Sequence, residues 1–356
     1  MNQPFLSIAV PTFNRARKLE IQLSTIHKLL SASQFSSNIE LLVVDNCSTD
    51  DTQDFIKSFS NQERKYTFSS YKNEKNIGAE GNFGQGILRS QGKFTWLLSD
   101  DDTVHKDAID HIFQSLYSNQ EVGFCFVNYD VDPTIGIPAI KVDDKDIITS
   151  SIREYISCTM FADSMISACI YRKSLLEVDA LTTMKEGPYE YMYWTLNTLR
   201  YHPALIIQTP LFSVHHPGIK ESRQSASKRE DNKDFYLEAH LDFLKYTSYV
   251  YDFSLGLGLR VKIYRLKVNE NLNQIIYHKI TTGNFGYNFG ALKVAFPIML
   301  HKFFLSPSFW LIHLPLLLLP SPCAKFFEPL RWKYLDLRAF LGNFIRKILI
   351  YTKAGN

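Results

Sequence analysis

The sequence has 356 residues, of which 45% are hydrophobic and 21% charged, with 26 Phe and 19 Tyr. This composition excludes an intrinsically disordered chain and allows one large domain or two smaller ones. The net charge is only +3 but is unevenly spread, because residues 256–356 hold 14 Lys and Arg against 3 Asp and Glu, and the rest hold 25 against 33. The 5 cysteines form no CxxC pair, which argues against a disulfide framework or a zinc site and favours a reducing compartment.

Strands and helices are expected to alternate along the first part of the chain. Short apolar runs followed by turn residues predict strands at 5–13, 39–44, 66–73, 93–99 and 121–131. Helical spacing of apolar residues predicts helices at 14–33, from Ser48 or Thr49 onward, at 78–91 and at 106–118. This alternation is typical of an α/β fold with a mostly parallel sheet flanked by helices.

The C-terminal region is expected to be helical and to contact a membrane surface. Segment 303–320 is nearly uncharged, but it is interrupted by prolines and too short to cross a bilayer cleanly. Segment 331–353 interleaves aromatic residues with Lys and Arg, a pattern that suits an anionic membrane surface. The alternative is a helix that packs on its own domain. Because no basic segment precedes the first apolar run, we expect a cytoplasmic protein, peripheral to the inner face of the plasma membrane.

Polar turns follow three of the predicted strands, at 11–15, 45–51 and 99–102. In a parallel α/β sheet, ligands bind beyond the carboxyl ends of the strands. The three turns are therefore expected to converge on one binding site.

The third of these turns contains three consecutive carboxylates, Asp100, Asp101 and Asp102. Adjacent negative charges are costly unless a cation or protons neutralise them, and no basic residue lies within this turn. A divalent ion, Mg²⁺ or Mn²⁺, prefers oxygen ligands and can bridge diphosphate oxygens, so we expect a metal site here. The alternative is a solvated turn that caps the helix beginning at 106.

Further candidate residues lie at other turns. Asp45 directly follows a strand, where its carboxylate can bind a nucleobase or ribose hydroxyl, or alternatively form an Asx turn that caps the next helix. Glu190 lies among aromatic residues, a setting that suits a general base, although an ordinary helix-face glutamate fits as well. His215 and His216 precede a Pro-Gly turn, where either could be a late metal ligand or could bind nothing.

Four segments stand out by their order and spacing. They read "SIAVPTFNRARKLEIQLSTI", "ELLVVDNCSTDDT", "NEKNIGAEGNFGQGILRSQGKFTWLLSDDDTVHKDAI" and "HHPG". Together they resemble the family 2 glycosyltransferases, inverting enzymes of the nucleotide-diphospho-sugar transferase (GT-A) fold, over residues 5–220. The resemblance implies a catalytic nucleotide-sugar domain at 1–225, followed by a helical, basic and aromatic region at 226–356.

The same resemblance implies roles for individual residues. Those expected to bind the donor are Pro11, Thr12, Phe13, Asp45, Asn76, Gly78, Asn82 and Asp101. The expected metal ligands are Asp102, Asp100 and His216, the expected catalytic base is Glu190, and Glu186 is a rival base. The sequence departs from the family pattern at two places. Ser99 stands at the first position of the acidic Asp-x-Asp-Asp motif, and Tyr189 precedes the base where the family has an acidic residue.

An enzyme of this family would move a hexose or deoxyhexose from a nucleotide-diphospho-sugar donor to a hydroxyl group of a glycan. Two of the motifs, "WLLSDDD" and "KNIG…NF", faintly resemble abequosyl- and rhamnosyl-transferases of bacterial surface polysaccharide (O-antigen) assembly. This resemblance implies a glycan acceptor linked to polyprenyl diphosphate. No nucleic-acid partner is expected. A sugar nucleotidyltransferase would need a Gly-rich loop after the first strand, which "VPTFNRARK" lacks. A catalytically inactive, membrane-surface protein that binds nucleotide sugars is the second alternative.

Overall fold

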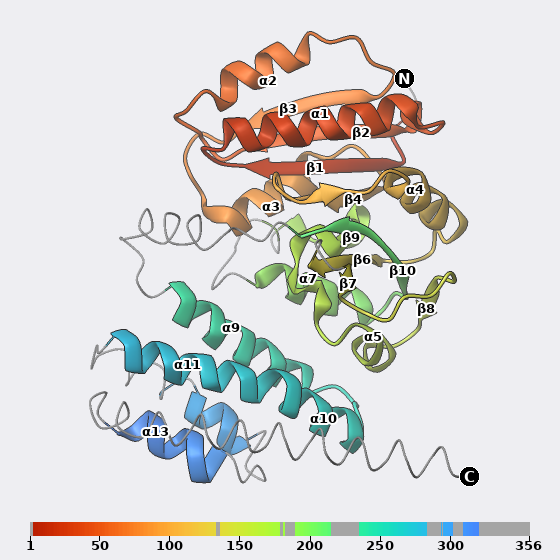
Figure 1. Cartoon of the computed structure of the whole chain (residues 1–356). Helices are drawn as coiled ribbons and strands as arrows, with labels where there is room; N and C mark the ends of the chain where they lie inside the picture. The colour runs from red at the N-terminus through yellow and green to blue at the C-terminus, as the bar shows by residue number, and fades with distance from the viewer. Residues whose placement is uncertain are drawn as a thin grey trace. The chain divides into compact units, whose positions relative to one another are not determined.

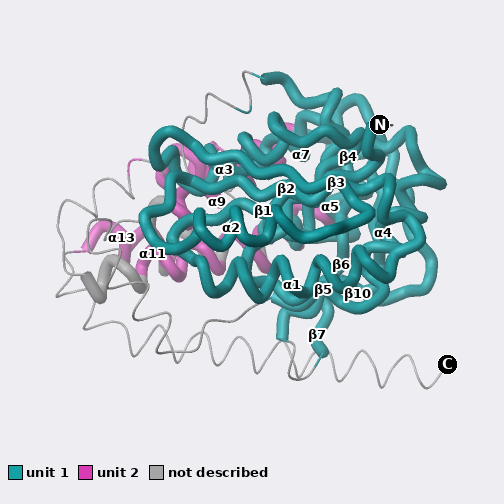
Figure 2. The backbone as a smooth tube through the Cα atoms, turned by 90° about the horizontal axis from the view of Figure 1, so that it is seen from above, with its two compact units in different colours: residues 1–233, 253–255 teal, residues 234–252, 256–356 magenta. Residues whose placement is uncertain are grey.

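The computed structural model of the chain describes residues 3–132, 136–178, 181, 189–214, 235–282, 293, 295–301 and 309–319. The chain is divided into two compact units (Figure 2), one of residues 1–233 and 253–255 and the other of residues 234–252 and 256–356. The domain boundary predicted after residue 225 lies within 215–234, outside the described residues.

The first unit begins with alternating strands and helices (Figure 1). These are β1 (Leu6–Thr12), α1 (Ala16–Ala32), β2 (Ile39–Asp45), α2 (Thr52–Ser60), β3 (Thr67–Lys72), α3 (Gly78–Arg89), β4 (Phe94–Leu97) and α4 (Ala108–Ser118), with a 3-10 turn at Ser36–Asn38. β1 pairs in parallel with β2 and β4, and β2 pairs in parallel with β3. Every predicted segment overlaps its element. β2 extends one residue beyond the predicted 39–44, to Asp45, and α2 begins at Thr52, after Asp51, and not at Ser48 or Thr49.

The second half of this unit continues the same sheet with both strand directions. Its elements are β5 (Thr103–Val104), β6 (Phe124–Asp132), β7 (Ile137–Pro138), β8 (Ile147–Thr149), α5 (Ile152–Thr159), β9 (Cys169–Arg172), α7 (Glu190–Leu199) and β10 (Ala204–Ser213), with 3-10 turns at Ala162–Ser164, Ile166–Ala168 and Lys173–Leu175. The sheet order is β3-β2-β1-β4-β9-β6-β10-β5, with β7 beside β6 and β8 beside β10. β9 runs antiparallel between β4 and β6, so β6 and β10 point the same way as β1.

The core of this unit consists of its central strands, which are buried along their whole length. Every residue of β1, β2 and β4 is buried, as expected for strands whose apolar runs are nearly continuous. Two buried residues of β2 carry a carboxyl group, Glu40 and Asp45. The Glu40 carboxylate accepts hydrogen bonds from the Ser7 hydroxyl at 2.5 Å, the Ser69 hydroxyl at 2.6 Å and the Gln91 amide at 2.7 Å. These bonds join β1, β2, β3 and the turn between α3 and β4, and they stabilise a charge that would otherwise be costly to bury.

The second unit is helical in its described part. Its elements are α9 (Phe235–Val250), α10 (Leu257–Ile263), a π-helical turn (Tyr264–Val268), α11 (Asn269–Thr282), a second π-helical turn (Phe309–His313) and α13 (Leu314–Leu318). Helices α9 and α11 pack together, and His240 Nδ1 lies 2.9 Å from Asn271 Oδ1 across their contact. None of the described helices has the length and apolar character needed to cross a bilayer. Segment 331–353 and residues 303–308 and 320 of segment 303–320 lie outside the described residues.

Close packing where the chain enters β4 predicts a cost for enlarging Gly92. A methyl group there would lie 2.6 Å from the Ser7 amide nitrogen and 2.8 Å from the Phe94 carbonyl oxygen. We expect Gly92→Ala to lower the free energy of unfolding by about 1–3 kcal/mol, measured by urea denaturation followed by circular dichroism. Gly258→Ala is the control, because Gly258 has open space around it, and it should be neutral or slightly stabilising. Equal midpoints for the wild type and Gly92→Ala would contradict this packing.

Candidate active site

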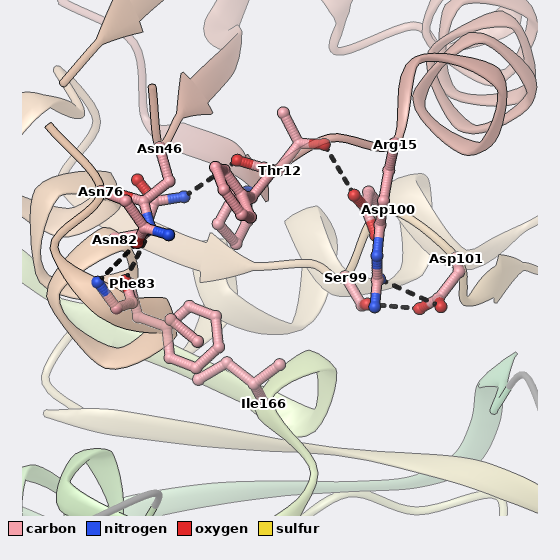
Figure 3. A pocket seen from close by; sticks show the side chains of 14 residues that line it. Thr12, Arg15, Asn46, Asn76, Asn82, Phe83, Ser99, Asp100, Asp101 and Ile166 are labelled. Carbon is pink, nitrogen blue, oxygen red and sulfur yellow. Dashed lines mark hydrogen bonds and ion pairs between the residues drawn. The ribbon is translucent and has the colours of Figure 1, made fainter. Parts of the chain in front are cut away.

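A polar pocket of about 440 Å³ lies at the carboxyl ends of the strands in the first unit (Figure 3). Its lining comes from the ends of β1, β2 and β4, from α3 and from the turn before β9. The lining residues are Pro11, Thr12, Phe13, Arg15, Asn46, Asn76, Gly78, Ala79, Asn82, Phe83, Ser99, Asp100, Asp101 and Ile166. Each of the three turns that were predicted to converge therefore contributes to one pocket.

Two cations of the first βα unit lie against the acidic turn, which the sequence analysis did not anticipate. Arg15 Nη1 lies 2.7 Å from Asp100 Oδ1 and 3.2 Å from Asp101 Oδ2 (Figure 3). Lys18 Nζ lies 3.0 Å from the same oxygen of Asp101. The carboxylates also accept hydrogen bonds from two hydroxyl groups, Asp100 from Thr12 at 2.7 Å and Asp101 from Ser99 at 2.6 Å. Neutralisation of this turn therefore comes in part from the protein itself.

The surroundings of the two carboxylates that line the pocket shift their pKa values in opposite directions. Asp100 is almost completely buried, and the loss of hydration raises its pKa above the ordinary value although Arg15 and Thr12 act against this. For Asp101 burial also acts to raise the pKa, but the hydrogen bond from Ser99 and the charges of Arg15 and Lys18 outweigh it, so the pKa of Asp101 is lowered. The negative charge at the pocket wall is thus held most firmly on Asp101.

Asp102 occupies a different position from its two neighbours. It is buried and is not among the residues that line the pocket. Its Oδ2 accepts a hydrogen bond from the Ser167 hydroxyl at 2.6 Å, and the Ser167 oxygen in turn accepts one from the Ser99 amide at 2.9 Å. Through this pair of bonds, Asp102 holds the acidic turn against the segment that precedes β9.

The donor atoms of the acidic turn suit a divalent cation, because carboxylate oxygens are the ligands that Mg²⁺ and Mn²⁺ prefer. Asp100 and Asp101 present such oxygens to the pocket, but both are paired with protein cations. Across the described part of the chain, no three His, Cys, Asp or Glu side chains converge into a metal cluster. His216, the third predicted ligand, lies outside that part. A cation could therefore bind these oxygens, but only in competition with Arg15 and Lys18.

Asp45, which was predicted to bind the donor, is fully buried and does not line the pocket. Its Oδ1 accepts hydrogen bonds from the amide at 3.0 Å and the hydroxyl of Ser48, and its Oδ2 accepts one from Gln53 at 2.5 Å. This is the turn-forming arrangement that was weighed as the alternative role for Asp45. The adjacent Asn46 faces the pocket in its place.

Asparagine side chains organise the other end of the pocket. Asn46 Nδ2 donates to Asn76 Oδ1 at 2.7 Å and to the Gly78 carbonyl at 2.9 Å, while its Oδ1 accepts from the Ile77 amide at 3.0 Å. Asn73 donates both to Asn46 Oδ1 at 3.0 Å and to Asn82 Oδ1 at 2.9 Å. This amide network, defined as Asn46, Asn73, Asn76 and Asn82, joins the end of β2 to the turn that precedes α3.

Asn82 of the amide network also fixes two strand ends. Its Nδ2 donates to the Val44 carbonyl at 2.9 Å and to the Thr12 carbonyl at 3.4 Å. Asn76, Gly78 and Asn82 were predicted to lie along the donor, and all three line the pocket. Asn46 was not predicted, although its place directly after a buried strand is the same signal that led to Asp45.

Glu190, the predicted catalytic base, is half-buried and is the first residue of α7. Its neighbour Tyr191 packs edge-to-face on Phe83, a pocket residue, with ring centres 6.0 Å apart. The start of α7 is thereby placed beside the pocket wall. The rival Glu186 and the histidines His215 and His216 lie outside the described residues.

Comparison with solved structures identifies the fold. The structure of residues 1–349 of TarS from S. aureus in complex with UDP-GlcNAc covers 83% of this chain and 89% of its own, with 13% identity and a TM-score of 0.50. The mannosyltransferase PcManGT from Pyrobaculum calidifontis, in complex with GDP-Man and Mn²⁺, covers 92% of this chain and 88% of its own, with 13% identity and a TM-score of 0.50. The chain has the mixed α/β fold of the GT-A glycosyltransferases, as its motifs implied.

Sequence comparison then identifies the family. Residues 7–178 match the family model described as Glycosyl transferase family 2, and this segment is a member of that family. Abequosyltransferase RfbV of Salmonella typhimurium is 30% identical over 122 residues, which are 34% of this chain and 35% of that protein. The GalNAc(5)-diNAcBac-PP-undecaprenol beta-1,3-glucosyltransferase of Campylobacter jejuni is 31% identical over 111 residues, which are 31% of this chain and 34% of that protein. The matches thus span about a third of the length of each of these relatives.

The amide network predicts a stability effect at Asn46. Asn46→Ala removes the partners of the Ile77 amide, the Gly78 carbonyl and two asparagine side chains. We expect a loss of about 1–3 kcal/mol in the free energy of unfolding, measured by urea denaturation, together with weaker nucleotide binding. Asn61→Ala is the control, since Asn61 is exposed. If the two variants unfold at the same urea concentration, the network does not support the pocket.

Proposed function

We propose that this chain is an inverting, metal-dependent glycosyltransferase that moves a sugar from a nucleotide-diphospho-sugar donor to a hydroxyl group of a lipid-linked glycan in surface polysaccharide synthesis. The observation that carries the proposal is the pocket itself, in which an uncharged amide network faces a carboxylate turn within a family 2 segment. The names of the relatives support it, because they describe an abequosyltransferase and a glucosyltransferase for an undecaprenol-linked glycan. The complexes of the structural neighbours with UDP-GlcNAc and with GDP-Man and Mn²⁺ support the donor class and the metal.

In the proposed reaction, the two ends of the pocket have separate tasks. The pocket-lining asparagines of the amide network and Thr12 position the nucleoside. Asp100 and Asp101 would hold the Mg²⁺ or Mn²⁺ ion, whose positive charge would stabilise the negative charge of the leaving nucleoside diphosphate. Glu190 accepts the proton of the acceptor hydroxyl. The acceptor oxygen forms a bond to the anomeric carbon as the bond from that carbon to the phosphate oxygen breaks, and attack from the opposite face inverts the configuration.

The enzyme class is tested by incubating the full chain with labelled UDP- and GDP-sugars and Mn²⁺, without an acceptor and then with polyprenyl-diphosphate-linked glycans. We expect slow donor hydrolysis in the first case and transfer in the second. A protein that binds a nucleotide sugar but neither hydrolyses nor transfers it would instead be the catalytically inactive binding protein considered above.

Removal of the proposed base gives a residue-level test. Glu190→Gln is expected to lower kcat by about 10²- to 10⁴-fold and to leave donor affinity nearly unchanged, because only proton transfer is lost. Initial-rate kinetics and donor titration measure the two effects. Glu177→Gln, at an exposed carboxylate of the same unit, is the control. Should Glu186→Gln cause the large loss while Glu190→Gln does not, the base is Glu186.

We further propose that the protein is cytoplasmic and binds the inner face of the plasma membrane through its second unit. Helix α10 exposes Leu257 at 78% and Val261 at 52%, four residues apart and therefore on one helix face. The basic residues Arg260 and Lys262 are exposed on the same short helix. Apolar side chains flanked by cations suit shallow insertion among anionic headgroups.

Vesicle binding tests this surface. The double variant Leu257→Ser and Val261→Ser is expected to sediment several-fold less with vesicles that contain anionic lipid than the wild type does, because less apolar area can be buried. Ile21→Ser is the matched control, since Ile21 is 60% exposed in α1 of the other unit. Sedimentation of the double variant at the wild-type level would exclude α10 as the contact.

A further inference from the structure

The side chains that pair with the acidic turn belong to one end of α1. Arg15 is the residue that precedes the helix and Lys18 lies in its first turn, and that turn contains no acidic residue. The amino end of a helix carries partial positive charge, so it adds to the two cations. A positive helix end therefore faces Asp100 and Asp101, with contacts of 2.7 to 3.2 Å.

The backbone before α1 is built to place Arg15. Asn14 has a positive φ of 52°, a conformation that asparagine tolerates better than most residues, and it turns the chain sharply after β1. Its side-chain oxygen accepts a hydrogen bond from the Thr49 amide at 2.8 Å, and its own amide donates to Ser48 Oγ at 2.8 Å. The turn is thus pinned to the loop that follows β2.

The side chains of Arg15 and Lys18, by contrast, are not enclosed. They are 43% and 37% exposed, whereas Asp100 and Asp101 are 3% and 20% exposed. The cations are the exposed members of these pairs, so they can move into solvent, and the loss of Arg15 from the buried Asp100 carboxylate is tolerated only when another cation replaces it. When they open, Asp100 keeps its bond from Thr12 and Asp101 keeps its bond from Ser99, and neither carboxylate is left without a donor.

Two carboxylates and two protein cations already balance in charge. A divalent cation at the same oxygens would lie beside Arg15 and Lys18, and like charges at such distances repel strongly. The protein cations and a divalent ion are therefore alternative partners for Asp100 and Asp101. Arg15 also lines the pocket, and a guanidinium group binds phosphate oxygens in a bidentate manner.

We propose that Arg15 and Lys18 are exchangeable counter-ions of the acidic turn, which a divalent cation displaces, and that the released Arg15 binds the diphosphate of the donor. The second half of the exchange rests on the function proposed above, and the first half concerns only the metal ion. Arg15 is then a donor-binding residue, and Lys18 limits the affinity of the empty pocket for metal.

The first test uses Mn²⁺ alone, with no nucleotide, and follows free Mn²⁺ by electron paramagnetic resonance. Arg15→Gln and Lys18→Gln should each bind Mn²⁺ about tenfold more tightly than the wild type, because a competing charge is gone. Arg17→Gln is the matched control. This variant removes the same charge from the same helix turn, but Arg17 has no ion pair within the described residues. The Mn²⁺ dissociation constant of Arg17→Gln should therefore stay within about twofold of the wild-type value.

The second test measures the binding of UDP and of GDP at saturating Mn²⁺. Arg15→Gln should weaken binding of the nucleotide that the wild type prefers by about tenfold, although it binds the metal more tightly. Gain of metal affinity with loss of nucleotide affinity is a pattern that simple damage to the fold does not produce. Lys18→Gln repeats the metal test without disturbing the buried Asp100, should Arg15→Gln prove unstable.

Two results would overturn the proposal. One is Mn²⁺ binding that is unchanged or weaker in both Arg15→Gln and Lys18→Gln, and the other is wild-type nucleotide affinity in Arg15→Gln. Failure of the wild type to bind either nucleotide would count against the proposed function instead, and the comparison with Mn²⁺ alone would still decide whether the counter-ions exchange.

Discussion

The ends of β1 and β4 meet at one carboxylate, and the pocket depends on this junction. Asp100, at the end of β4, accepts the Thr12 hydroxyl from the last residue of β1 and the Arg15 guanidinium from the turn beyond it. Burial disfavours the charge of Asp100 and raises its pKa, and these two donors offset only part of that effect. This junction fixes the position of the acidic turn relative to the first helix. The amide network likewise fixes the position of α3 relative to the end of β2.

The βα units at the start of the chain could be predicted because their signals are local. Buried parallel strands appear as continuous apolar runs, and the stripe Leu19, Leu23, Ile26 and Leu30 marks the buried face of α1. β9 and β10 were not predicted. β9 has four residues, and β10 contains Gln208 and Pro210, which interrupt the apolar pattern of a strand. The antiparallel insertion of β9 follows from pairing between distant segments, which periodicity does not encode.

The candidate site was predictable in its location but not in its pairings. The rule that ligands bind at the carboxyl ends of parallel strands led to the three turns that line the pocket. Arg15 and Asp100 are 85 positions apart in the sequence, so a search for cations within the acidic turn itself could not find the partner. Asp45 is the last residue of β2 and Asn46 is the next residue, and only the path of the turn decides which of them faces the pocket.

The asparagine network has a consequence for how the two ends of the pocket respond to their surroundings. Its members, Asn46, Asn73, Asn76 and Asn82, neither gain nor lose a proton in the ordinary pH range, so the network keeps the same charge state as the pH changes. The opposite end is held by ion pairs whose cations are partly exposed, and dissolved salt weakens the Lys18–Asp101 pair more than the pair between Arg15 and the buried Asp100. Ionic strength therefore affects the two ends of the pocket differently. Higher salt weakens the ion pairs between the start of α1 and the acidic turn, and it leaves the hydrogen bonds of the asparagine network unchanged.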